Sequence, residues 1–128
     1  MSETKKFTVI AVDDSAIIRT MMRKYLRDEA EFLGEGKNGA EGVELYKKAL
    51  DGGNPPDLVL MDITMDHMDG MEAARAILDM NKDAKIIMVS ALSDTDNIKN
   101  CIDMGVSDYI VKPFSGESLM DSIRNTLS

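Results

Sequence analysis

The sequence predicts an α/β domain in which helices cover both faces of a parallel sheet. Short apolar runs alternate strictly with longer segments of helical period, five of each. Most of the short runs are apolar at consecutive positions, which is typical of strands buried on both faces. Because crossovers between parallel strands are right-handed, this order favours a doubly wound sheet.

The five strands are predicted at residues 8–12, 31–34, 58–61, 85–89 and 107–111. The second is the weakest, because it is short and polar, and it fits the edge of the sheet. In the 2-1-3-4-5 order, one of the common orders of doubly wound sheets, the other four strands are consecutive neighbours.

The five helices are predicted between these strands. The first follows Ser15, a plausible N-cap, and places its apolar residues on one stripe. The others are expected at residues 39–50, 71–80, 94–104 and 115–127. A glycine- and proline-rich turn at residues 52–56 ends the second helix.

Length and composition indicate one domain over residues 1–128, with a core from about 7 to 127 and no output domain. A net charge of -8 argues against a nucleic-acid partner, whose phosphates need Lys and Arg. The single Cys101 excludes an internal disulfide. Since no apolar run is long enough for a signal peptide or membrane span, we expect a soluble cytoplasmic protein.

Polar residues follow four of the predicted strands: Asp13 and Asp14, then Asp62, Ser90 and Lys112. Ligands of open α/β sheets bind at the carboxyl ends of the strands, where these side chains should converge. Three close carboxylates repel one another unless a cation offsets their charge. Oxygen ligands without His or Cys favour Mg²⁺, which is usually shared with phosphate oxygens.

The same side chains suit phosphoryl transfer. Lys112 supplies an ammonium and Ser90 a hydroxyl that could hold phosphoryl oxygens. The only histidine, His67, has no evident Ser or Cys partner, so a nucleophilic triad is excluded. The remaining nucleophile is a carboxylate, and its attack on phosphorus gives an acyl phosphate.

Five motifs in order resemble the receiver domain of two-component response regulators in its stand-alone, CheY-like form. They are VDDS at 12–15, LVLMDITM at 58–65, MDG at 68–70, SA at 90–91 and DYIVKPF at 108–114. Each motif alone is weak, but all of them at the ends of successive predicted strands are strong. The resemblance covers residues 7 to about 127.

The resemblance implies that Asp62 accepts a phosphoryl group from a phosphohistidine on a sensor histidine kinase or phosphotransfer protein. Asp14, Asp62 and the backbone carbonyl of Thr64 would bind Mg²⁺ directly, and Asp13 would bind it through water. Lys112, followed by a cis bond to Pro113, would contact the phosphoryl group.

The resemblance also implies a switch. Ser90 would follow the phosphoryl group, and Tyr109 would swing from an exposed to a buried position. The face of the fourth helix, fifth strand and fifth helix would then bind a target protein, with the flagellar motor and chemotaxis as the first expectation. Such a chain is a signalling protein rather than an enzyme, although it catalyses its own phosphotransfer and autodephosphorylation.

Three alternatives remain open at this stage: a phosphorelay intermediate, an Mg²⁺-dependent phosphatase with an aspartyl intermediate, and a receiver-shaped binding module that is never phosphorylated. The GxGxxG at residues 34–39 is rejected as a dinucleotide site, because it follows the polar edge strand. Asp66 stands where many family members carry proline. Asp69 is expected to cap the third helix, Cys101 to be buried and His67 exposed.

Overall fold

The computed structural model describes residues 6–65 and 67–128. Its five parallel strands form one sheet in the order β2-β1-β3-β4-β5, so the predicted fold is confirmed. In chain order the elements are β1 (Phe7–Val12), α1 (Ala16–Leu26), β2 (Ala30–Gly36), α2 (Gly39–Asp51), β3 (Leu58–Met61), α3 (Gly70–Met80), β4 (Ile86–Ser90), α4 (Thr95–Met104), β5 (Asp108–Val111) and α5 (Gly116–Leu127).

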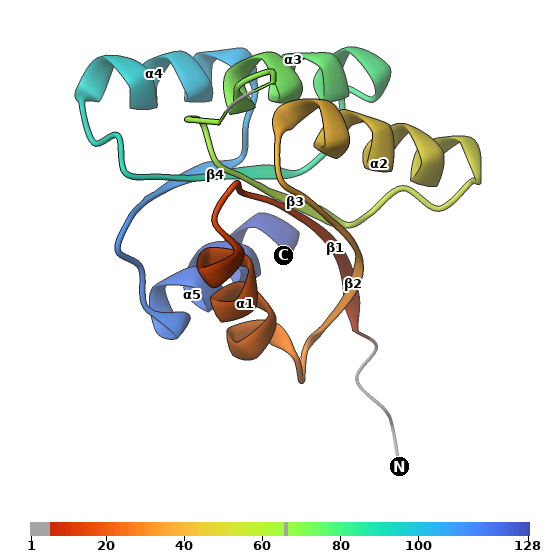
Figure 1. Cartoon of the computed structure of the whole chain (residues 1–128), viewed down its shortest axis with the longest axis horizontal. Coiled ribbons are helices and arrows are strands. Elements are labelled where there is room, and N and C mark those ends of the chain that lie inside the picture. Colours follow the sequence, from red (N-terminus) through yellow and green to blue (C-terminus); the bar gives the residue numbers. More distant parts are fainter. Residues whose placement is uncertain (1–5, 66) are drawn as a thin grey trace.

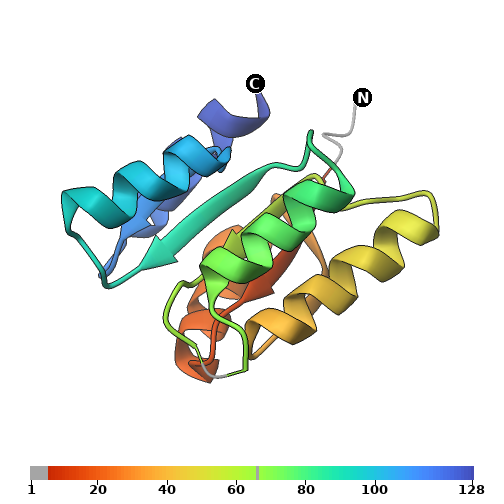
Figure 2. The same ribbon diagram turned by 90° about the horizontal axis from the view of Figure 1, so that it is seen from above.

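Helices lie on both faces of the sheet. Figure 1 shows α2, α3 and α4 on one face and α1 and α5 on the other, and Figure 2 shows the first three side by side from above. Alternate residues of β1 serve the two faces: Ile10 and Val12 pack beneath α2 and α3, whereas Val9 and Ala11 pack against α1 and α5. All four are buried, because a strand between two helical layers has no face left for water.

The edge strand β2 differs most from its prediction. It runs from Ala30 to Gly36 rather than over residues 31–34, and it pairs with β1 along its whole length. A register shift leaves Leu33 as an extra residue between the pairs Val9 with Phe32 and Ile10 with Gly34. Polar residues are tolerated here because β2 lies at the edge of the sheet, where only Ala30 and Gly36 of the strand are buried.

Each helix begins at a side-chain N-cap that accepts a hydrogen bond from the backbone N–H three residues on. The caps are Ser15, Asn38, Asp69, Asp94 and Ser115. Such caps satisfy N–H groups that have no partner within the helix. The predicted caps at Ser15 and Asp69 are confirmed, and they anchor two loops that follow the strands.

Two smaller predictions are also confirmed, since Cys101 is buried and His67 is exposed. Ser90, expected just after the fourth strand, is instead its last residue. Within residues 6–65 and 67–128, no helix has the length and apolar character needed to cross a membrane.

Candidate functional site

The sheet itself places the predicted side chains at one edge. The backbone N–H of Asp13 donates to Gly36 O at 3.0 Å, and that of Asp62 donates to Val12 O at 2.9 Å. The N–H of Lys112 donates to Ser90 O at 2.8 Å. These hydrogen bonds continue the ladders of β1, β3 and β5 by one residue, so each functional backbone is held as firmly as a strand.

Three carboxylates meet at this edge. One oxygen from each of Asp13, Asp14 and Asp62 lies within 4.8 Å of the other two. Asp13 is fully buried and Asp62 is 5% exposed, while Asp14 is open to solvent. The predicted convergence is therefore present, with two ligand candidates shielded from water and one accessible to it.

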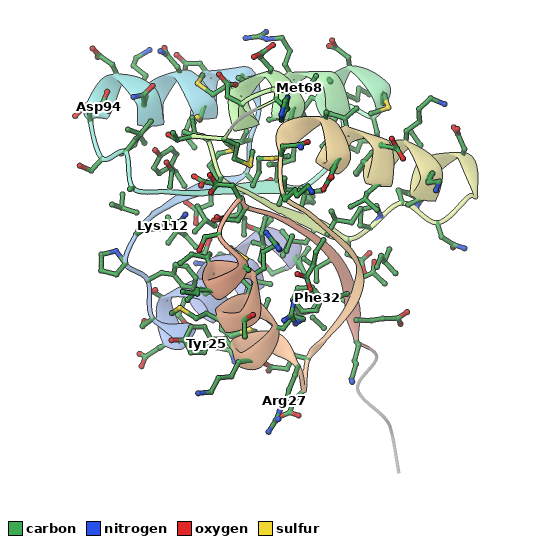
Figure 3. The ribbon with its side chains drawn as sticks, in the orientation of Figure 1. Tyr25, Arg27, Phe32, Met68, Asp94 and Lys112 are labelled. Carbon is green, nitrogen blue, oxygen red and sulfur yellow. The ribbon has the colours of Figure 1, made fainter. Side chains whose placement is uncertain are left out.

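Lys112 bridges the two buried carboxylates. Its Nζ lies 2.8 Å from Asp13 Oδ2 and 3.2 Å from Asp62 Oδ2, and Figure 3 shows Lys112 beside the loops that follow the strands. The other oxygen of Asp13 accepts from the backbone N–H of Ser15 at 2.9 Å. One ammonium thus serves two anions, and the cluster keeps an excess of negative charge.

The electrostatics of the pair reflect this imbalance. Burial raises the pKa of Asp62, and the charge of Asp13 raises it further, against the opposing effect of Lys112. For Lys112, burial alone would lower the pKa, but Asp13 and Asp62 together outweigh it and leave the pKa raised. The site would therefore be stabilised by a further cation near the carboxylates.

Ser90 and Tyr109 meet at one residue, Leu92. The buried Ser90 Oγ accepts a hydrogen bond from Leu92 N at 3.2 Å, and the half-buried Tyr109 Oη donates to Leu92 O at 2.6 Å. Burial raises the pKa of the Tyr109 phenol. Leu92, in the segment after β4, is thus bonded through its N–H to Ser90 of the site and through its carbonyl to Tyr109 of β5.

Sequence reasoning missed two glycines that shape the loop after Asp62. A Cβ on Gly70 would lie 1.8 Å from the backbone oxygen of Asp62, so α3 begins in direct contact with that peptide. A Cβ on Gly39 would lie 2.4 Å from Met68 O, which accepts a hydrogen bond from Gly39 N. The signal for Gly70 was its place directly after the Asp69 cap.

The same loop carries unusual backbone geometry. His67 and Met68 have φ values of 53° and 76°, a left-handed region that non-glycine residues rarely adopt. Their carbonyls accept hydrogen bonds from Ala40 N at 3.3 Å and Gly39 N at 3.0 Å. The first turn of α2 thus holds this part of the loop. Asp66 lies outside the described residues.

A family model for the response regulator receiver domain matches residues 9–124. The chain belongs to this family. Its relatives include proteins named chemotaxis protein CheY. Those of Halobacterium salinarum and Bacillus subtilis are each 39% identical to the chain, over 120 and 121 residues. These matches cover 94% of this chain and 96% and 97% of the two relatives.

Solved structures agree with this assignment. The receiver domain superposes on a chain of the CheX–CheY–BeF3–Mg²⁺ complex from Borrelia burgdorferi with a TM-score of 0.88 and 28% identity. That match covers 95% of this chain and 90% of the other. The response regulator domain of Thermotoga maritima CheB gives a TM-score of 0.83 at 29% identity, covering 96% and 97%.

Family membership accounts for most of the sequence motifs. The acidic cluster lies in the receiver fold where Asp13, Asp14 and Asp62 were expected to converge, and the Lys112–Pro113 peptide bond is cis. Thr64 is exposed, two residues after Asp62, and the role predicted for its carbonyl stays a prediction. The N–H groups of Gly39 and Ala40 at the start of α2 already donate to Met68 O and His67 O, which argues against a dinucleotide phosphate at the glycines of residues 34–39.

Proposed function

We propose that Asp62 accepts a phosphoryl group from the phosphohistidine of a sensor histidine kinase or phosphotransfer protein. The observation that carries the proposal is the position of Asp62, which follows a buried strand and shares Lys112 with Asp13. Asp69 lacks this setting, because its carboxylate caps α3 by accepting a hydrogen bond from Glu72 N.

The proposal includes Mg²⁺ at the acidic cluster. Asp14, Asp62 and the Thr64 carbonyl would bind it directly, and Asp13 through water. The donor set fits, since three carboxylate oxygens lie within 4.8 Å of one another and hard oxygen ligands suit Mg²⁺. When bound, the ion would neutralise the cluster and hold phosphoryl oxygens. Support also comes from the Borrelia complex, which contains Mg²⁺.

In the proposed step, a carboxylate oxygen of Asp62 attacks phosphorus and forms a new P–O bond. The P–N bond of the donor breaks, and its electron pair stays on the imidazole nitrogen. Lys112 already contacts Asp62 and would stabilise the negative charge on the phosphoryl oxygens, while the Ser90 hydroxyl would donate a hydrogen bond to one of them. The product is an acyl phosphate on Asp62.

The contacts at Leu92 suggest how the signal leaves the site. If the Ser90 hydroxyl turns to the phosphoryl group, Leu92 N loses its acceptor, and the segment bonded to Tyr109 is free to move. Tyr109 is already half-buried here, and its full movement to a buried position stays a prediction. We propose that this shift alters the face of α4, β5 and α5, where Ile102 is 46% and Val111 38% exposed. A target protein would bind this face, in chemotaxis by analogy with the CheY relatives.

Acceptance is tested by intact mass after incubation with Mg²⁺ and acetyl phosphate. We expect one phosphoryl group on the wild type and none on Asp62→Asn. Asp69→Asn is the matched control, because Asp69 lies in the loop that follows Asp62 and asparagine caps helices as well as aspartate does. A phosphoryl group on Asp62→Asn, or its loss in Asp69→Asn, would contradict the assignment.

The pathway is tested separately with the phosphorylated chain. Binding to a flagellar-motor target peptide, increased by phosphorylation, would support a chemotaxis role. Transfer of the phosphoryl group to a second histidine phosphotransfer protein, without such binding, would instead identify a phosphorelay intermediate.

A further inference from the structure

Arg19 has no role in the mechanism above, although its side chain reaches the loop that carries the acidic cluster. Its Nη1 donates a hydrogen bond to the backbone oxygen of Asp13, and its Nε lies 3.1 Å from Glu35 Oε1. The second oxygen of Glu35 accepts from Arg23. The side chains of Arg19 and Glu35 are only 19% and 24% exposed, so most of this contact is shielded from water.

The contact with Arg19 completes the fixation of Asp13. Its N–H is bound to Gly36 O, and its two carboxylate oxygens accept from Ser15 N and Lys112 Nζ. The remaining polar group of Asp13 is its backbone carbonyl, which accepts a hydrogen bond from the guanidinium of Arg19. Every polar group of Asp13 therefore has a partner, each from a different part of the fold.

The carbonyl that Arg19 holds belongs to the peptide unit between Asp13 and Asp14. Because this unit is planar, fixing its oxygen also fixes the direction in which the chain continues to Asp14. Asp14 is exposed, and its carboxylate must stay near those of Asp13 and Asp62 for a metal site to exist. Its position therefore depends on the backbone before it more than on packing.

We propose that Arg19, oriented by Glu35, is a positioning residue for the acidic cluster and sets its affinity for Mg²⁺. The inference rests on the proposed Mg²⁺ site and adds a residue that is not itself a ligand. Residues behind a ligand that hold it in place commonly change metal affinity by an order of magnitude or more when they are replaced. Here the held group is a backbone carbonyl between two ligands.

A test must separate position from charge. Removing a positive charge beside carboxylates favours a divalent cation, which would mask a loss of geometry. Arg19→Lys keeps the charge but loses the planar fork that spans the Asp13 carbonyl and Glu35. Arg23→Lys is the matched control, because Arg23 lies one turn further along α1, bonds to the same Glu35, and has its other bond to Thr20.

The experiment is calorimetric titration of MgCl2 into each full-length variant, with urea unfolding in metal-free buffer alongside. We expect the Kd of Arg19→Lys for Mg²⁺ to rise about tenfold. That of Arg23→Lys should stay within about twofold of the wild type, because an exposed ion pair contributes little. A purely structural role for Arg19 would lower the urea midpoint but leave the Kd of the folded protein unchanged.

Glu35→Gln provides a second measurement, as the partner of Arg19→Lys in a double-mutant cycle. If Glu35 orients Arg19, then Arg19→Lys should raise the Kd less in the Glu35→Gln background than in the wild type. If the wild type binds Mg²⁺ and Arg19→Lys and Arg23→Lys have equal Kd values, the positioning role of Arg19 is overturned but the Mg²⁺ site is not. Absence of binding by the wild type would instead overturn the proposed Mg²⁺ site.

Discussion

Replacing Gly70 by alanine should damage both stability and phosphoryl acceptance. The new Cβ would lie 1.8 Å from Asp62 O, 2.7 Å from Asp62 C and 2.9 Å from Ile63 Cα, all of them backbone atoms. To reach the 3.0 Å that real contacts keep, α3 or the Asp62 peptide must move by about 1.2 Å. No side chain can rotate away to relieve this contact.

The size of the effect follows from two opposing contributions. Overpacking against fixed neighbours costs about 1–3 kcal/mol, and a backbone clash belongs at the upper end. Alanine recovers at most about 1 kcal/mol of helix propensity relative to glycine. We therefore expect Gly70→Ala to lower the free energy of unfolding by about 2 kcal/mol, which corresponds to a fall of about 1–2 M in the urea midpoint.

Urea unfolding followed by far-UV circular dichroism measures this change, and intact mass after acetyl phosphate treatment measures acceptance. Gly52→Ala is the control: its φ is -79°, and the nearest atoms to a new Cβ lie at 3.4 and 3.6 Å. It should stay within about 0.5 kcal/mol of the wild type. A Gly70→Ala protein as stable as the control would refute the clash, and full acceptance by a destabilised variant would refute its link to Asp62.

Three further predictions concern single side chains. Because burial raises the pKa of Asp62, folded protein binds this proton more tightly than unfolded protein, and the stability that it contributes is lost as pH rises from 3.8 through the raised pKa. In metal-free buffer, the free energy of unfolding of Asp62→Asn minus that of the wild type should therefore rise with pH across that window. A difference that falls as pH rises, measured by urea unfolding, would contradict this prediction. Asp14→Asn should abolish most of the rise in Tm that Mg²⁺ gives the wild type, since it removes the exposed carboxylate of the cluster, and an undiminished rise would exclude Asp14 as a ligand. Tyr46→Phe should cost about 1 kcal/mol in urea unfolding, because the buried Tyr46 Oη accepts from Asn81 Nδ2 at 3.0 Å, and Asn81→Ala should then add little to it.

The order of the strands and the convergence at their carboxyl ends could be predicted from the sequence. Apolar runs such as residues 58–61 report burial directly, and the residue after such a run must lie at the edge of the sheet. Asp13, Asp62 and Lys112 were identifiable for this reason. Their positions depend on chain direction, which the local patterns indicate, and on strand order, which follows a common order of doubly wound sheets.

Features that depend on contacts between distant elements could not be predicted in the same way. The length of β2 was underestimated because Glu35 and Gly36 are not typical of a strand, and their place in the sheet comes from pairing with β1. The partner of Arg19 is Glu35, 16 residues away, and only the packing of α1 beside β2 joins them. Gly70 looks like any glycine after a helix cap until α3 is placed against the Asp62 peptide.

The strand order also divides the molecule by how readily its parts open. Asp62 extends β3, which is paired on both sides, by β1 and β4, whereas Tyr109 lies on β5, which is paired only with β4. The amide hydrogens of edge strands generally exchange through local opening reactions of lower free energy than those of central strands. In the proposed function, phosphoryl transfer would therefore take place on the central part of the sheet, and the signal would pass through an edge strand that can rearrange without unfolding the centre.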